Sequence, residues 1–239
     1  MSIYKDSEYQ VRTDLADIHA SQLDQLGAPG TWGTGQQRLA IAAEARKAGY
    51  DASVLEEPKE SGAPIEVELP EVARNVVRHL AVSPKDFNEA AYNNARSGGL
   101  SDEEYVEIVG IVARISSLDV FARGIGVPLR PLPSPQPGEP SRDRPEAAIR
   151  EEAWVPTIPN PPEGGEAAEE HFAGQPKPYI VRALSLVPEE MHRHVELEEI
   201  QYLPLRHIME PDYQHHEGFT RAQVELVAGR VSALNECFY

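Results

Sequence analysis

Apolar residues recur along most of this chain at the three- and four-residue spacing that is typical of amphipathic helices. The clearest stretch is 101–124, where a Ser-x-x-Glu sequence that can form a capping box precedes a stripe of apolar side chains. Alternation of apolar and polar residues, the pattern of a strand, is limited to the short run 65–70. We therefore expect an all-α protein with a central core helix. The stripe consists of Tyr105, Ile108, Val109, Val112 and Ile115, widened by Ile111, Leu118 and Val120.

Proline divides the helical pattern unevenly. Eleven of the 21 prolines lie between Pro128 and Pro162, where apolar periodicity disappears. Because proline lacks an amide donor and disfavours helix at the preceding residue, this composition predicts an extended, solvated tether. The expected organisation is a helical unit over 1–133, a linker rich in Pro, Gly and Glu over 134–170, and a second unit over 171–239. Within the linker, we expect Trp154 to pin the chain onto one unit.

Two segments of the chain begin in the same way. Residues 34–43 align with residues 220–229, and each segment opens with a Thr-x-x-Gln capping box that is followed by an apolar helical pattern. In this alignment Leu39 falls at the position of Glu225, and Asp51 at that of Cys237. The pattern indicates an internal repeat.

Composition and charge narrow the functional classes. A chain of 239 residues with 41% hydrophobic residues can bury a substantial core, which excludes disorder throughout. Its net charge of -17 argues against binding to nucleic acid or anionic membranes. Because no apolar run approaches the length of a membrane span and the first residues lack the order of a secretory signal, we expect no membrane partner and a cytoplasmic location.

The sequence gives only weak signals for a metal or cofactor site. The single cysteine, Cys237, excludes an internal disulfide and a cluster of several thiolates. The pairs His192/His194 and His215/His216 lack carboxylate or cysteine partners at ligand spacing, so an exposed polar helix or loop explains them better. No cofactor and no metal are expected.

The final segment, 219–239, resembles the core of the alkylhydroperoxidase AhpD-like and carboxymuconolactone decarboxylase-like superfamily. The active motif of that family is a Glu on one helix, a Cys-x-x-Cys pair at the start of the next helix, and a His one turn further on. Here Glu225 precedes Cys237 by the interval that the family uses, and the sequence 232–235 resembles its approach to the first cysteine. The segment 100–128 also resembles a helix of peroxidase-related members.

The resemblance implies two AhpD-like helical units, of which the first has lost its catalytic residues and the second carries the chemistry. It implies a thiol- or selenol-dependent peroxidase with an antioxidant role, in which Cys237 resolves the reactive residue and Glu225 relays its proton. If Asn235 caps a helix that starts near Glu236, Cys237 stands in the first turn, whose free amides favour a thiolate. The implied partners are a small hydroperoxide, a thiol reductant or redox protein, and further copies of the chain.

The second redox residue of the motif would come directly after Tyr239. Our hypothesis is that this residue is a selenocysteine whose codon is read as a stop, giving a Cys-x-x-Sec pair. On this interpretation the second unit is incomplete and the 239-residue chain is inactive. The missing helix would also leave the apolar face of residues 221–234 exposed, which predicts weak solubility or oligomerisation.

Two alternatives remain open. The first is a cofactor-free decarboxylase or isomerase of the same superfamily, which would use acid/base groups instead of a redox pair. The second is a catalytically silent scaffold, in which both units only mediate assembly. Alkylation of Cys237 separates a redox enzyme from a scaffold, because only the enzyme loses turnover.

Overall fold

The structure, a computed structural model, describes residues 2–56, 62 and 64–237. Within these ranges the chain is helical and forms no strand, which confirms the all-α expectation. The α-helices are α1 (Thr13–Gln25), α2 (Gly35–Asp51), α3 (Glu71–Val82), α4 (Glu89–Ser97), α5 (Asp102–Gly124), α6 (Gly165–Phe172), α7 (Tyr179–Arg182), α8 (Pro188–Gln201) and α9 (Arg221–Leu234), and the 3-10 helices are η1 (Pro84–Asp86) and η2 (Leu205–His207).

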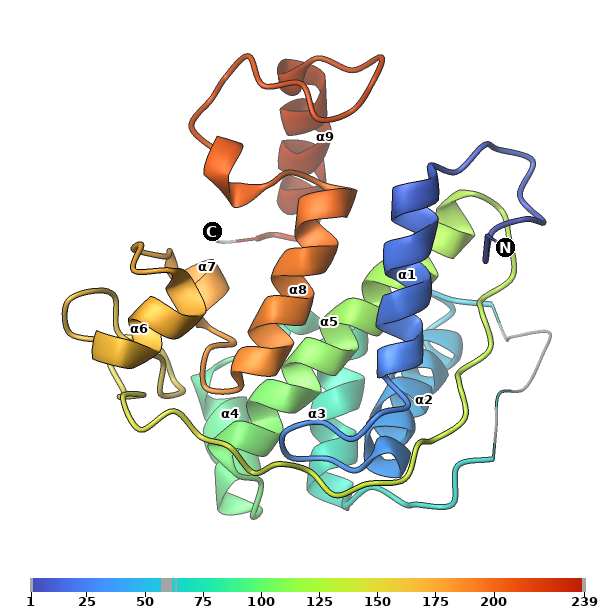
Figure 1. The fold of residues 1–239 in the computed structure, drawn as a ribbon. Helices are drawn as coiled ribbons and strands as arrows, with labels where there is room; N and C mark the ends of the chain where they lie inside the picture. The colour runs from blue at the N-terminus through green and yellow to red at the C-terminus, as the bar shows by residue number, and fades with distance from the viewer. Residues whose placement is uncertain (1, 57–61, 63, 238–239) are drawn as a thin grey trace.

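Helix α5 runs through the centre of the molecule (Figure 1). The Ser101 hydroxyl accepts a hydrogen bond from the Glu104 amide, and the Glu104 carboxylate accepts one from the Ser101 amide. The helix packs against α2 and α3, and also against α1 and α8. The expected core helix and its capping box are therefore confirmed. The placement of Val120 on the buried stripe is wrong, because this side chain is exposed.

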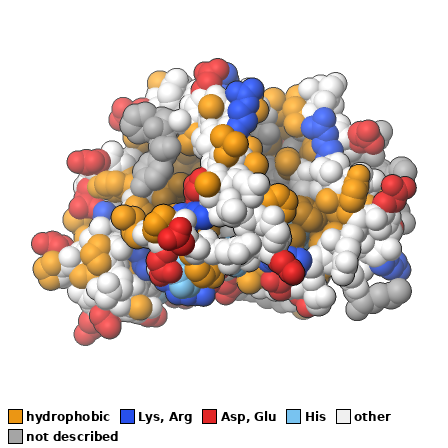
Figure 2. All heavy atoms as spheres, turned by 90° about the horizontal axis from the view of Figure 1, so that it is seen from above, with side chains coloured by type: hydrophobic (Ala, Val, Ile, Leu, Met, Phe, Trp, Pro, Cys, Tyr) orange, Lys and Arg blue, Asp and Glu red, His pale blue; other side chains and the backbone are white. Residues whose placement is uncertain are grey.

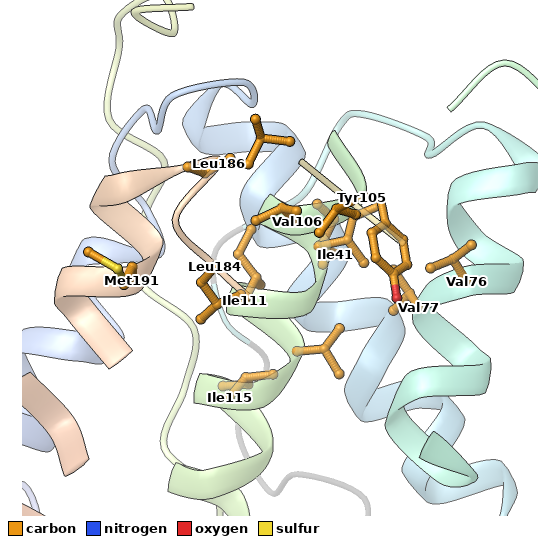
Figure 3. Packing of buried hydrophobic residues seen from close by; sticks show 14 of the residues in the cluster. Ile41, Val76, Val77, Tyr105, Val106, Ile111, Ile115, Leu184, Leu186 and Met191 are labelled. Atoms are coloured by element: carbon orange, nitrogen blue, oxygen red, sulfur yellow. The ribbon is translucent and has the colours of Figure 1, made fainter. Parts of the chain in front are cut away.

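Buried hydrophobic side chains form a continuous cluster around α5 (Figure 3). Ile111 and Ile115 of α5 have Val76 and Val77 of α3 on one side and Met191 of α8 on the other. The cluster thus draws on residues from both expected units, and the core is continuous between them. The division of the chain into two units stays a prediction.

The proline-rich segment lies along the helices (Figure 1). The Arg142 amide donates a hydrogen bond of 2.8 Å to the Thr31 carbonyl oxygen in the loop between α1 and α2. Further along, residues 155–159 are all buried. The expectation of a solvated tether over 134–170 is wrong at these places, because apolar side chains of the segment join the core.

Trp154 attaches the segment to α4. Its ring stacks on the ring of Tyr92, with centroids 6.1 Å apart. An isolated antiparallel bridge between Ile149 and Thr157 closes the loop that carries the tryptophan. The expectation that Trp154 pins this part of the chain is confirmed.

Four buried charged side chains, the buried tetrad, connect α2, α5 and α8. Arg38 of α2 pairs with Glu107 of α5 and, at 2.9 Å, with Glu190 of α8. Arg114 of α5 pairs with the second carboxylate oxygen of Glu190 at 2.6 Å. None of the four side chains is more than 3% exposed. Burial would raise the pKa of Glu190, but the positive charges of Arg114 and Arg38 outweigh burial and hold it at about 2.

Removal of one tetrad member leaves its partners charged, buried and unpaired. We expect Glu190→Ala to lower the free energy of unfolding by about 3–5 kcal/mol. The control is Glu199→Ala. Glu199 also lies on α8, but it forms an exposed ion pair with Arg206 of η2, so its removal should lower the free energy of unfolding by no more than about 1 kcal/mol. Urea denaturation of the two variants checks this, and equal losses of stability would contradict a dominant role of the tetrad.

His19 of α1 is fully buried at the contact between α1 and the end of α8. The Tyr4 hydroxyl lies 2.8 Å from its Nδ1, and the Gln201 side-chain oxygen lies 3.0 Å from its Nε2. Burial lowers the pKa of His19 below its usual 6.5, and the hydrogen bond with Gln201 opposes this only in part. The imidazole is therefore neutral in the folded chain at neutral pH.

The lowered pKa of His19 predicts a pH dependence of stability. Below pH 6.5 the unfolded chain binds a proton at this residue that the folded chain does not, so the free energy of unfolding falls as the pH decreases. NMR titration of the histidine rings, with His19→Gln to assign the signal, measures the pKa directly. A His19 ring that titrates at or above 6.5 would contradict this prediction.

Candidate functional site

Helix α9 carries Glu225 and is followed by Cys237, the two residues that the sequence indicates as catalytic, and it projects from one end of the helical body (Figure 1). The helix begins after Thr220, whose hydroxyl accepts a hydrogen bond from the Gln223 amide in the expected capping box. Thr34 and Gln37 form the same box at the start of α2. The prediction that the two segments open a helix in the same way is confirmed.

Cys237 follows the end of α9 as an exposed free thiol. Glu236 adopts a left-handed conformation, with φ of 51°. The Cys237 amide donates a hydrogen bond of 2.9 Å to the Ser232 carbonyl oxygen, and the Glu236 amide donates one of 3.3 Å to that of Ala233. These two bonds define a Schellman motif, which terminates the helix.

The expected position of Cys237 in the first turn of a helix is therefore wrong for the described residues. Asn235 is the C-terminal cap of α9 and not the N-terminal cap of a following helix. The C-terminal end of a helix presents carbonyl oxygens and the negative end of the dipole, whereas activation of a thiolate requires the amides of an N-terminus. The described part of the chain supplies the thiol without this activation.

Glu225 lies on the side of α9 that faces the preceding loop. One carboxylate oxygen accepts hydrogen bonds from the Tyr202 hydroxyl at 2.9 Å and from Arg221 Nε at 2.6 Å. Burial, followed by the hydrogen bond to Glu225, raises the pKa of Tyr202 to about 12. Arg221 also donates to the Ile208 carbonyl oxygen at 3.1 Å. Glu225 thus joins α9 to Tyr202, and Arg221, on the same helix, joins α9 to the preceding loop.

The structure does not bring Glu225 and Cys237 together. Glu225 is nine residues before the last residue of α9, which corresponds to about 14 Å along the helix axis. Its hydrogen-bond partners, Tyr202 and Arg221, were not identified from the sequence. The Arg221 contact has a sequence signal, since the two residues are four apart on one helix face, but Tyr202 comes from another element and has none.

The equivalent positions of the first repeat carry no comparable groups. Leu39 is fully buried in the core, and Asp51, the last residue of α2, forms an exposed ion pair with Lys47 at 2.9 Å. The repeat therefore has a packing residue where the second copy has a carboxylate.

A groove of about 620 Å³ lies between α3 and α4. Val72, Val76 and Phe87 line it together with polar side chains that include His79. Lys85, two residues before Phe87, forms an ion pair of 2.8 Å with Glu236. This contact brings the residue next to Cys237 to the segment that borders the groove.

His216, of the second histidine pair, forms hydrogen bonds through both ring nitrogens. His216 accepts a hydrogen bond at Nδ1 from Arg12 and donates one of 3.0 Å from Nε2 to the Tyr202 carbonyl oxygen. Burial, together with neighbouring positive groups, lowers its pKa. His216 therefore joins the start of α1 to the loop before α9. It lies in a loop, as expected, but it is only partly exposed. Among the described residues, no group of three or more His, Cys, Asp or Glu side chains is arranged to hold a metal ion.

Comparisons with protein-family models, with curated proteins and with solved structures find no match to this chain. The resemblance to the AhpD-like superfamily stays a prediction. No helix in the described ranges has the length and apolar character that are needed to cross a membrane.

The exposure of Cys237 predicts a freely reactive thiol. We expect the folded chain to react with a disulfide reagent at one thiol per chain, and at a rate that changes little when the chain is unfolded in guanidinium. Absorbance of the released thiolate measures both the number of thiols and the rate. A thiol that reacts only after unfolding would contradict this placement.

Proposed function

We propose that this chain acts in the thiol- or selenol-dependent reduction of hydroperoxides, with Cys237 as the resolving thiol and Glu225 as the proton relay. The observation that carries the proposal is the placement of Cys237 as an exposed free thiol at the end of the helix that bears Glu225. A resolving thiol must be reachable by a second redox residue and by an external reductant, and exposure allows both.

The reaction has three balanced steps. In the motif that the chain resembles, the reactive thiolate or selenolate stands three residues after Cys237. It attacks the peroxide and becomes a sulfenic or selenenic acid, the O–O bond breaks, and the alkoxide takes up a proton and leaves as an alcohol. Cys237 then attacks the oxidised residue, which forms an S–S or S–Se bond and releases water. Two thiols of an external reductant restore the pair and leave as a disulfide.

Glu225 has the contacts of a group that can pass on a proton. Its carboxylate is half-exposed and hydrogen-bonded to the Tyr202 hydroxyl at 2.9 Å, so a proton can move between the carboxylate and solvent. The groove between α3 and α4 offers apolar lining for the organic part of a small hydroperoxide. A thiol reductant or redox protein is the partner, and a cytoplasmic location fits the reduced thiol.

The test compares the product of the whole gene, with any residues that it encodes after Tyr239, with the 239-residue chain. Consumption of an organic hydroperoxide is measured with dithiothreitol as reductant. We expect turnover in the gene product, loss of turnover in Cys237→Ser, and a loss of about 100-fold in Glu225→Gln, as is typical for removal of a general acid or base.

Glu199→Gln is the matched control, because Glu199 is also a half-exposed glutamate whose oxygen pairs with an arginine. It should retain full turnover. Equal activity of the Glu225→Gln and Glu199→Gln variants would refute the role of Glu225. A gene product that consumes no hydroperoxide, or that is unaffected by Cys237→Ser, would refute the proposal.

One observation favours a second candidate, a catalytically silent scaffold: no residue of α9 is buried, which is typical of a helix that binds another surface. Alkylation of Cys237 distinguishes the two candidates, because it abolishes peroxide turnover in a redox enzyme and leaves a scaffold unchanged.

A further inference from the structure

Two groups of opposite hydrogen-bonding character hold the ring of His216. Arg12 donates to its Nδ1, and its Nε2 donates to the Tyr202 carbonyl oxygen at 3.0 Å. A guanidinium has only donors and a carbonyl oxygen only accepts, so the ring must be neutral, with its one proton on Nε2. We call these two contacts of His216 the histidine latch.

Arg12 is itself held in place beside the ring. Its Nε and Nη2 donate to the two carboxylate oxygens of Asp14 at 3.0 and 2.9 Å, and Nη2 also donates to the Ile200 carbonyl oxygen at 3.0 Å. These bonds fix a permanent positive charge next to Nδ1 of His216. A proton on Nδ1 would place one donor against another and a second positive charge beside the first. The closed latch therefore excludes the protonated form of His216.

The surroundings of the ring act in the same direction. Burial lowers the pKa of His216 most, and the positive charges of His215 and Arg12 lower it further. The hydrogen bond with the Tyr202 carbonyl oxygen and the negative charge of Asp14 raise the pKa, but by less. From α8, the Ile200 carbonyl oxygen, which carries no charge, faces the latch. The pKa of His216 in the closed latch thus lies below its usual 6.5.

The latch ties the end of the chain to its start. It joins Arg12, directly before α1, to a residue 204 positions later in the loop that leads into α9. None of the 14 residues of α9, all of which the structure describes, is buried. At the end of the molecule where α9 projects, hydrophobic side chains lie at the surface in several patches (Figure 2). Helix α9 therefore owes its position to polar contacts.

Other polar contacts of the segment 206–237 with the rest of the chain hold it less firmly. Arg206 pairs with Glu199 at 3.1 Å and Glu236 pairs with Lys85 at 2.8 Å, but both ion pairs are exposed and stabilise little in water. The hydrogen bond of Glu225 with Tyr202 lies where the chain leaves α8. It allows the segment to turn about this point.

We propose that the histidine latch is a pH-sensitive switch, which holds the segment 206–237 against the start of α1 at neutral pH and releases it when His216 takes up a proton. In the released segment the ring is solvated and titrates near 6.5. Below this pH the open state binds a proton that the closed state does not, so the closed latch loses stability as the pH falls.

Release changes the position of Glu225 and Cys237 relative to the helical body, because both residues belong to the segment. The switch would make any activity of these residues dependent on pH. The inference goes beyond the proposed reaction, and it stands whether or not the two residues take part in redox chemistry.

Hydrogen exchange of the 239-residue chain at pH 7.5 and 5.5 tests the switch, with the rates corrected for the intrinsic effect of pH. Peptides from α9 report the release, because a helix of 14 residues without further contacts is barely stable in water. We expect the protection of α9 to fall by about 10-fold at pH 5.5, the limit that linkage sets for one histidine of pKa 6.5. Peptides from α5 report global unfolding and should change much less.

His216→Gln removes the titration and keeps the contacts, because an amide can accept from Arg12 and donate to the Tyr202 carbonyl oxygen. Its α9 should be equally protected at both pH values. His215→Gln is the matched control. Nε2 of His215 lies 3.4 Å from the Ile200 carbonyl oxygen, which can accept from the neutral and from the protonated ring. This variant should keep the pH dependence of the wild-type chain.

Arg12→Ala opens the latch at any pH and should leave α9 poorly protected at both values. Protection of α9 that is the same at pH 7.5 and 5.5 in the wild-type chain would overturn the proposal. A His216→Gln variant with the wild-type pH dependence, or an Arg12→Ala variant with wild-type protection at pH 7.5, would overturn it as well.

Discussion

The buried tetrad of Arg38, Glu107, Glu190 and Arg114 is the constraint on which the arrangement of the helices depends. Each guanidinium and each carboxylate is removed from water, so each requires its partner in place. Since the four side chains come from three helices, their pairing fixes α8 against α5 and α2 at one relative position. Apolar packing alone would tolerate several such positions, whereas opposite charges inside a core do not.

The tetrad also reaches the loops. The backbone amides of Trp32 and Gly33 donate hydrogen bonds of 2.8 and 2.9 Å to one carboxylate oxygen of Glu107. Through these bonds the loop between α1 and α2 is held against α5, and with it the capped start of α2. The position of α8 in turn affects the orientation of α9, because Tyr202, directly after α8, donates a hydrogen bond to Glu225 of α9.

Local features of the fold could be predicted from the sequence, and contacts between distant residues could not. The start of α5 and the capping boxes of α2 and α9 depend on residues three apart, so their pattern is readable. The tetrad had a weaker signal, a charged residue within an apolar run, as at Glu107. Its partners are up to 152 positions away, and nothing in the periodicity connects them. At the candidate site, the Schellman motif at Cys237 depends on the left-handed backbone conformation of Glu236. Glutamate rarely adopts this conformation, so the sequence does not predict it.

The proline-rich segment has a consequence for the unfolded chain. Its backbone donates hydrogen bonds at Gln136 and Arg142 to the loop between α1 and α2, and it passes along the helices for more than 20 residues without regular structure. Immobilising an irregular segment of that length normally carries a large conformational entropy cost. Proline restricts φ before folding begins, so these residues have less freedom to lose. Replacing the exposed prolines of the segment, such as Pro131 and Pro137, by flexible residues would therefore lower the free energy of unfolding by giving the unfolded chain more freedom.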